Sequence, residues 1–88
     1  MEIVNQTRPI VEIYGTEICP YCIQAKRLVG QRDWELKEYR VDEKVELKEE
    51  MNVRANKEVR TVPQIFVNGE YVGGYTDFVD FLDVTELV

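Results

Sequence analysis

Histidine is absent from this chain, and cysteine occurs only twice, at positions 19 and 22. The missing imidazole excludes histidine-based acid–base catalysis and histidine metal ligation. Two cysteines alone do not supply the four Cys or His ligands of a zinc site within one chain. A disulfide between residues three positions apart closes a very small loop and adds little stability. Reactivity therefore explains the pair better than structure does, with two inert buried thiols as the remaining alternative.

Long apolar runs are also missing. No stretch approaches the roughly eighteen residues that a membrane-spanning helix needs, and the polar segment 1–9 lacks the apolar region of a signal peptide. The net charge of −6 disfavours non-specific binding to nucleic acid or to an anionic membrane. We therefore expect a protein of the reducing cytoplasm, with no nucleic-acid or membrane partner. In that compartment a close cysteine pair is more often catalytic or metal-binding than structural.

The composition is that of an ordinary globular protein. Hydrophobic residues make up 44% of the chain and charged residues 32%. A chain of this length is enough for one domain with a small core, so we expect residues 1–88 to form a single domain. Nothing in the pattern signals an obligate interface, and we expect a monomer.

Turn-forming residues divide the chain into seven predicted elements. β-branched and aromatic residues concentrate in four stretches that we predict as strands: 10–14, 34–41, 64–67 and 71–72. We predict three helices, which begin at Pro20, after Asp42 as N-cap and after Thr76 as N-cap. Gly30 is expected to end the first helix as a left-handed cap. Asn68-Gly69 predicts a tight hairpin turn between the last two strands.

The order of these elements is β-α-β-α-β-β-α. The first β-α-β unit implies a parallel pair of strands with a right-handed crossover, and the hairpin adds an antiparallel pair. The sequence therefore predicts an α/β fold in which a mixed four-stranded sheet is flanked by helices.

The cysteine pair follows the first predicted strand and opens the first predicted helix, the setting of a thioredoxin-like redox site. Pro20 suits the first helical position, because no helical partner awaits its missing N–H, and Cys19 is then the N-cap. A thiolate there meets free N–H groups and the positive end of the helix dipole, so the pKa of Cys19 should fall below about 8.5. Cys22, one turn further on, should be more buried and less acidic. The pattern predicts Cys19 as nucleophile and Cys22 as resolving thiol.

Three segments, in register over nearly the whole chain, resemble the glutaredoxin family. They are V-E-I-Y-G-T-E-I-C-P-Y-C (11–22), R-T-V-P-Q-I-F-V (60–67) and G-G-Y-T-D (73–77). The resemblance implies a thioredoxin-like fold without the extra N-terminal strand and helix of thioredoxin itself. It also implies a thiol–disulfide oxidoreductase that uses glutathione as reductant and holds no covalently bound cofactor.

The resemblance further implies roles for matching positions. Pro20, Tyr21 and Pro63 would support the active site, and a cis bond before Pro63 would leave the Val62 backbone free to pair with an extended substrate. The implied glutathione-binding residues are Tyr21, Arg60, Thr61, Val62, Pro63, Gly74, Thr76 and Asp77.

The charges of glutathione give some of these assignments a physical reason. Free N–H groups at a helix start suit its γ-glutamyl carboxylate, and an acidic side chain suits its ammonium, which favours Thr76 and Asp77. Simple helix capping is the alternative for both, and the two roles can coexist. Arg60 would reach the glycyl carboxylate, with a solvated arginine as the alternative.

Three functions compete at this level. The leading one is a glutathione-dependent dithiol enzyme that reduces protein disulfides or protein–glutathione mixed disulfides. The second is a redoxin that takes electrons from thioredoxin reductase and serves ribonucleotide reductase. It is suggested by Tyr75 after the glycine pair and by Gly15-Thr16-Glu17, which lacks a basic residue. The third is a binding module for a [2Fe–2S] cluster shared between two chains, against which Pro20 and the second cysteine argue.

Overall fold

The computed structural model describes residues 8–86, so most of the polar segment 1–9 lies outside the described residues. Within that range the order of strands and helices is the predicted one, and their ends agree to within a few residues. The elements are β1 (Ile10–Gly15), α1 (Pro20–Gln31), β2 (Glu35–Arg40), α2 (Val45–Ala55), β3 (Gln64–Val67), β4 (Glu70–Gly73) and α3 (Tyr75–Glu86).

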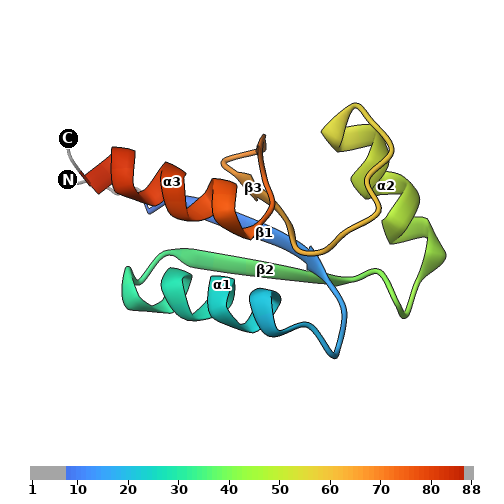
Figure 1. Cartoon of the computed structure of the whole chain (residues 1–88), viewed down its shortest axis with the longest axis horizontal. Helices are drawn as coiled ribbons and strands as arrows, with labels where there is room; N and C mark the ends of the chain where they lie inside the picture. The colour runs from blue at the N-terminus through green and yellow to red at the C-terminus, as the bar shows by residue number, and fades with distance from the viewer. Residues whose placement is uncertain (1–7, 87–88) are drawn as a thin grey trace, which may run out of the picture.

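The four strands form one mixed sheet in the order β2-β1-β3-β4 (Figure 1). β1 pairs in parallel with β2 and antiparallel with β3, and β3 pairs antiparallel with β4. Asn68 and Gly69 connect the last pair with φ angles of 51° and 85°, the two positive values that a type I′ hairpin turn requires. The predicted sheet and hairpin are confirmed.

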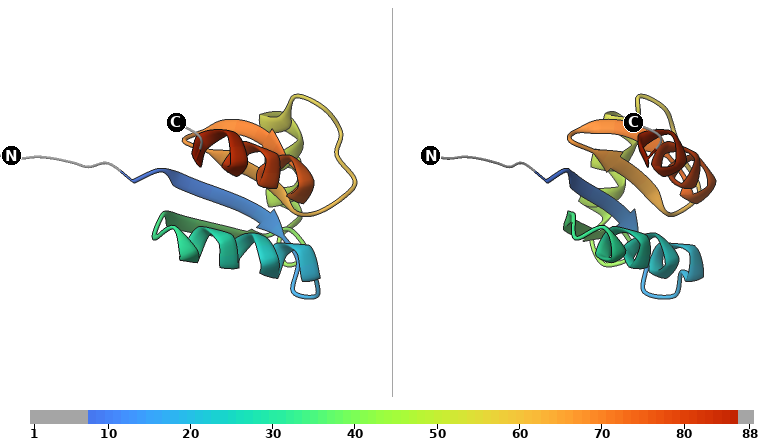
Figure 2. Two further views of the ribbon diagram at one scale, coloured as in Figure 1. Left: turned by 60° about the vertical axis from the view of Figure 1, so that its left-hand side comes forward. Right: turned by 90° about the vertical axis from the view of Figure 1, so that its left-hand side faces the viewer.

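The two faces of the sheet carry separate hydrophobic clusters, because successive side chains of a strand point to opposite faces. One cluster joins the sheet to α1 and α3 and contains Val11, Ile13, Ala25, Val29, Ile65, Val67, Phe78 and Leu82. The other joins the sheet to α2 and contains Tyr14, Met51, Ala55, Val59 and Phe66. Figure 2 shows α1 and α3 on one side of the strands and α2 on the other.

A carboxylate in the middle of β1 is matched by an arginine of α2. Arg54 donates from Nη2 to Glu12 Oε1 at 2.8 Å, and from Nη1 to Glu12 Oε2 at 3.0 Å and to the Tyr14 hydroxyl at 2.8 Å. The Tyr39 hydroxyl donates to Glu12 Oε2 at 2.9 Å. The guanidinium also lies 4.3 Å from the centre of the Phe66 ring. These charge-assisted contacts fasten α2 to the sheet.

The same contacts shift two pKa values in opposite directions. The hydrogen bond from Arg54 holds the pKa of Glu12 below its ordinary value of 4.5. Burial raises the pKa of Tyr14 to about 12, and the hydrogen bond to Glu50 adds to the rise. Glu12 is therefore ionised and Tyr14 neutral throughout the physiological pH range.

The predicted end of α1 at Gly30 and the predicted N-cap of α2 at Asp42 are both wrong. Gly30 lies inside α1, and the turn after the helix places Asp33 at a φ of 58°. Asp42 does not cap α2, because its carboxylate binds Arg40. Lys44 occupies that N-cap position without a side-chain hydrogen bond.

The predicted start of the last helix is also displaced. Thr76 lies inside the first turn of α3. The Gly74 carbonyl accepts the first hydrogen bond of this helix, from Phe78 N–H at 3.0 Å. Asp77 Oδ2 accepts the Gly74 N–H at 3.1 Å. The helix therefore begins after Gly74, with Asp77 reaching back as in a capping box.

Replacing Arg54 with methionine tests the contact between α2 and β1. We expect Arg54→Met to lower the free energy of unfolding by about 2 kcal/mol at pH 7, because it leaves a largely buried Glu12 carboxylate unpaired. The folded-state pKa of Glu12 is lowered, so its contribution is present above pH 4.5 and is lost as the pH falls through the folded pKa. The stability gap from wild type, measured by urea unfolding, should therefore narrow at acidic pH.

The matched control is Arg27→Met, which removes the same charge from an exposed position on α1. It should change the free energy of unfolding by less than about 0.5 kcal/mol at every pH. A gap for Arg54→Met that stays the same from pH 7 to pH 3 would contradict the role given to Glu12.

Candidate active site

Cys19 and Cys22 lie at the start of α1, where the chain leaves the end of β1. Cys19 is the N-cap, in an extended conformation (φ −150°, ψ 93°), and its Sγ accepts the Cys22 N–H at 3.2 Å. Pro20 occupies the first turn, as predicted. The two sulfur atoms are bonded in this structure, with their Cα atoms 5.2 Å apart. The helix start therefore places an N–H donor on the sulfur that would carry negative charge after reduction.

The surroundings of the two cysteines differ more than their exposure does. Cys19 and Cys22 are 6% and 4% exposed, so the expected greater burial of Cys22 is slight in the disulfide form. Cys22 packs against the backbone of Gly15, where an added Cβ would lie 2.7 Å from its Sγ. Beside Cys19, by contrast, Ile18 is 89% exposed and Tyr21 57% exposed. A substrate therefore meets an open apolar rim at Cys19.

The start of α3 lies beside the start of α1. The rings of Tyr21 and Tyr75 are stacked with their centres 5.2 Å apart, and the Tyr75 hydroxyl donates to Gln24 Oε1 at 3.2 Å. Gly73 has a φ of 126°, and a Cβ there would collide with the Asp77 carboxylate. The stacking of Tyr21 on Tyr75 places the start of α3, with the predicted residues Thr76 and Asp77, beside the start of α1. The part played by Tyr75 was missed, because nothing in its spacing signals a contact with Tyr21.

The segment before β3 completes this end of the molecule. The peptide bond between Val62 and Pro63 is cis, as expected. Thr61 is exposed and accepts hydrogen bonds from Gln64 Nε2 on its carbonyl oxygen at 2.9 Å and on its hydroxyl at 3.2 Å. Gly74 packs close to the Pro63 carbonyl, since a Cβ there would lie 3.7 Å from that oxygen.

Arg60 is exposed, and its Nη2 pairs with Glu58 Oε2 at 3.3 Å. Its side chain is 80% exposed, and an ion pair at such a position is weak. Arg60 is therefore available to a ligand, although it makes no hydrogen bond to the other predicted site residues.

A cavity of about 240 Å³ lies between α2, this segment and the loop after β1. Its lining residues are Thr16, Val41, Lys48, Met51, Val59, Arg60, Thr61 and Val62. Lys48 is an addition to the predicted site. The signal for it was weak: it precedes the buried Met51 by one helical turn and so borders the buried face of α2. The cavity thus combines two cations, Lys48 and Arg60, with Val62, and the cations suit a carboxylate ligand.

A second hollow, of about 380 Å³, lies between β4 and α3. Its lining residues are Val67, Glu70, Tyr71, Val72, Asp77, Asp80 and Phe81. Asp77 is the predicted site residue that borders it.

The described residues contain no group of three or more His, Cys, Asp or Glu side chains placed to hold a metal ion. Among residues 8–86, no helix is both long and apolar enough to cross a membrane. The chemistry that this arrangement supports is the making and breaking of a disulfide at Cys19, with Cys22 as the internal partner.

The known proteins to which this chain is similar are glutaredoxins. The family model described as Glutaredoxin matches residues 11–72. Glutaredoxin 1 of Escherichia coli is 46% identical over 72 residues, which cover 75% of this chain and 84% of that protein. The solved structure of reduced Escherichia coli glutaredoxin has a TM-score of 0.77 and 33% identity, covering 90% of this chain and 99% of the other. Glutaredoxin 1 from Francisella tularensis, complexed with cacodylate, has a TM-score of 0.71, 28% identity and coverages of 91% and 99%.

The packing of Gly15 on Cys22 is tested by adding one methyl group. We expect Gly15→Ala to lower the free energy of unfolding of the oxidised protein by roughly 1–3 kcal/mol, because the new Cβ would lie 2.7 Å from Cys22 Sγ, which is held by its bond to Cys19. The measurement is chemical unfolding of the oxidised and the reduced protein. The loss should be larger in the oxidised protein, where the disulfide holds Cys22 in place.

Gly30→Ala is the matched control, because its added Cβ meets nothing within 4 Å and its position is an exposed helix interior. That substitution should raise the free energy of unfolding by up to about 1 kcal/mol. Equal effects of the two substitutions would show that Gly15 is not packed against Cys22.

Proposed function

The chain belongs to the glutaredoxin family and is a thiol–disulfide oxidoreductase; we propose that glutathione is the reductant that recharges its cysteine pair. The observation that carries the proposal is the cavity beside Val62, which presents the cations Lys48 and Arg60. Glutathione is a tripeptide with two carboxylates and one ammonium. A site that holds it needs positive groups on one side and an N–H cluster with an acid on the other.

The proposed reaction proceeds through a mixed disulfide at Cys19. The Cys19 thiolate attacks one sulfur of the substrate disulfide, so that a Cys19–substrate bond forms and the other substrate sulfur leaves as a thiolate and takes a proton from water. Cys22 then loses its proton and attacks Cys19 Sγ, which releases the second substrate thiol. The product is the Cys19–Cys22 disulfide of this structure.

Two molecules of glutathione would restore the dithiol. The first attacks Cys19 Sγ as a thiolate, forms a Cys19–glutathione disulfide and frees the Cys22 thiol. The second attacks the glutathione sulfur of that disulfide, so that glutathione disulfide leaves and Cys19 is returned as a thiolate. Two electrons pass from two glutathione thiols to the protein, and no metal or other cofactor takes part.

In this proposal, the tripeptide extends from the cavity past Val62 to the start of α3. Its cysteinyl backbone pairs with Val62, beside the cis bond to Pro63. Its glycyl carboxylate enters the cavity and meets Lys48 and Arg60.

The γ-glutamyl end would meet the first turn of α3. Its carboxylate would be held by the Thr76 N–H and the neighbouring N–H groups of the first turn after Gly74, which have no partner inside the helix. Its ammonium would meet the Asp77 carboxylate, which is exposed. Tyr21, stacked on Tyr75, would flank the sulfur atoms.

The proposed substrates are protein disulfides and protein–glutathione mixed disulfides of the reducing cytoplasm, with ribonucleotide reductase among the protein targets. We propose that the 88-residue chain acts as one domain and as a monomer. The apolar rim formed by Ile18 and Tyr21 supports a protein substrate, because an exposed apolar patch around a reactive group favours contact with another protein surface.

The identity of the reductant is tested first, by steady-state reduction of a small mixed disulfide in two parallel assays. One assay contains glutathione, glutathione reductase and NADPH; the other contains thioredoxin reductase and NADPH. We expect NADPH oxidation in the first only. Cys19→Ser should abolish turnover, and Cys22→Ser should abolish reduction of protein disulfides but keep the release of glutathione from mixed disulfides. Turnover only with thioredoxin reductase would refute the proposal.

The contribution of the cavity is tested by removing its lysine. We expect Lys48→Gln to raise the KM for glutathione roughly tenfold with little change in kcat, because a charged contact to a carboxylate contributes about 1.5 kcal/mol to binding. Arg27→Gln removes the same charge from an exposed position of α1 and should leave KM within about twofold. An unchanged KM in Lys48→Gln would place the glycyl carboxylate elsewhere.

A further inference from the structure

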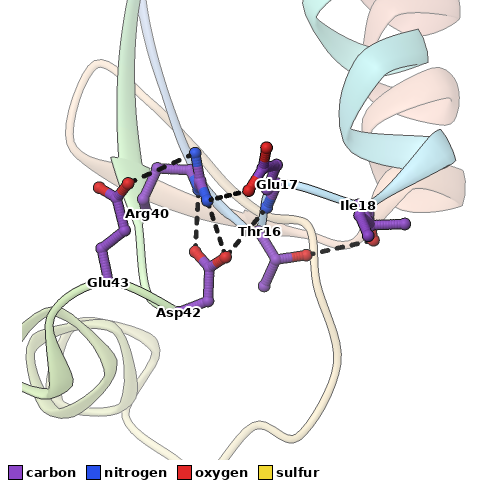
Figure 3. Close-up of polar contacts among 6 residues, drawn as sticks. All are labelled: Thr16, Glu17, Ile18, Arg40, Asp42 and Glu43. Atoms are coloured by element: carbon purple, nitrogen blue, oxygen red, sulfur yellow. Dashed lines mark hydrogen bonds and ion pairs between the residues drawn. The ribbon is translucent and has the colours of Figure 1, made fainter.

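An ion-pair cluster ties the loop before Cys19 to the end of β2. The Arg40 guanidinium donates from Nε to Asp42 Oδ1 and from Nη2 to Asp42 Oδ2, both at 2.8 Å (Figure 3). Asp42 Oδ2 also accepts the backbone N–H of Glu17 at 3.2 Å. The Asp42 carboxylate thus binds both the Arg40 guanidinium and the Glu17 backbone. Arg40 fixes the position of Asp42, and Asp42 in turn fixes the position of the loop at Glu17. We call Glu17, Arg40, Asp42 and Glu43 the Arg40 cluster.

The Arg40 cluster contains three carboxylates and one cation. Arg40 Nη2 lies 3.5 Å from Glu17 Oε1, and Arg40 Nη1 lies 3.7 Å from Glu43 Oε2. The hydrogen bond from Arg40 holds the pKa of Asp42 well below its usual range, so Asp42 is ionised near neutral pH. Arg40 is therefore the group that offsets the negative charge of this loop.

The loop matters because it leads directly into the nucleophile. Glu17 stands two residues before Cys19, whose Sγ accepts the Cys22 N–H. The loop is fixed at its start by the hydrogen bond from Val41 N–H to the Gly15 carbonyl at 2.9 Å, and Thr16 Oγ1 donates to the Ile18 carbonyl at 3.4 Å. A carboxylate so close in the chain opposes a thiolate unless a cation holds and neutralises it.

The other charged side chains around the cysteine pair do not contact Glu17. Lys26 of α1 pairs with Glu38, and Arg60 pairs with Glu58. Asp77 of α3 accepts the Gly74 N–H, and Lys48 of α2 lines the cavity. Arg27 is exposed on α1. Within the described residues, Arg40 is the one cation that the structure pairs with Glu17.

We propose that Arg40 is a positioning residue for the active-site loop: it holds the Glu17 carboxylate in an ion pair and thereby keeps the Cys19 thiolate favoured after reduction. Arg40 acts through the Glu17 carboxylate, and its ion pairs are with Glu17, Asp42 and Glu43 rather than with either sulfur atom. The proposal concerns the thiol pair alone and holds whichever reductant recharges it.

The test is the pH dependence of iodoacetamide alkylation of Cys19 in the reduced full-length protein, with the modified residue identified by mass spectrometry. We expect Arg40→Gln to raise the apparent pKa of Cys19 by about half a unit, the size typical of an exposed ion pair. The shift should shrink in 1 M salt, which screens exposed charges. Arg40→Lys keeps the positive charge, so the apparent pKa of Cys19 should stay close to that of the wild type. Arg27→Gln is the control, because it removes a cation that does not contact Glu17.

The double variant separates a charge effect from general loosening of the loop. If Arg40 acts by neutralising Glu17, Arg40→Gln should shift the apparent pKa of Cys19 by less than about 0.2 unit in a Glu17→Gln background. An equal shift in both backgrounds would overturn the proposal, as would no shift in the wild-type background.

Glu17→Gln alone tests the same point if Arg40→Gln fails to fold. Because Arg40 already neutralises the carboxylate, the single change should leave the apparent pKa of Cys19 within about 0.2 unit of wild type. A fall of half a unit or more would show that Glu17 acts on the thiolate unopposed, and the proposal would be wrong. No glutathione enters these assays, so their outcome is separate from that of the reductant assay.

Discussion

β1 is covered on both faces, and the elements that reach the cysteine pair are positioned against it. Val11 and Ile13 face α1 and α3, while Glu12 and Tyr14 face α2. A charged residue in such a strand requires a partner from the covering helix, because an unpaired buried carboxylate is costly. Arg54 is that partner, with Phe66 beneath its guanidinium. Burial of the strand and pairing of its one charge therefore act together to place α2.

The active site uses backbone groups more than charged side chains. The Cys22 N–H donates to Cys19 Sγ, and the first-turn N–H groups of α3 have no partner inside that helix. Both helices begin at one end of the molecule, where the stacked rings of Tyr21 and Tyr75 join them. Electrostatic support for a thiolate at this end thus comes from fixed dipoles, which do not depend on a histidine or a metal. Side-chain charges are placed around that centre, in the cavity of Lys48 and in the Arg40 cluster.

The sequence was sufficient for the features that local chemistry decides. Cys19 as N-cap, Pro20 in the first turn and the Asn68-Gly69 hairpin follow from rules that span a few residues. The cis bond before Pro63 followed from the family resemblance. The errors arose where a different contact decided the helix start: Asp42 binds Arg40, two residues before it, and the N–H of the distant Glu17. Asp77 accepts the Gly74 N–H, three residues before it, and so sets the start of α3. Tyr75 reaches the site only through tertiary packing, which no local pattern encodes, and the spacing of Lys48 from the buried Met51 is only a weak local signal.

The contact between Gly15 and Cys22 limits which positions around the cysteine pair tolerate substitution. Position 15 admits no side chain, because the resolving sulfur fills the adjacent space. Pro20 and Tyr21, between the two cysteines, are both exposed and lie outside the hydrophobic core. Substitution between the sulfur atoms therefore has space at Pro20, whereas a change at Tyr21 loses the stacking on Tyr75 and any side chain at position 15 displaces the resolving sulfur.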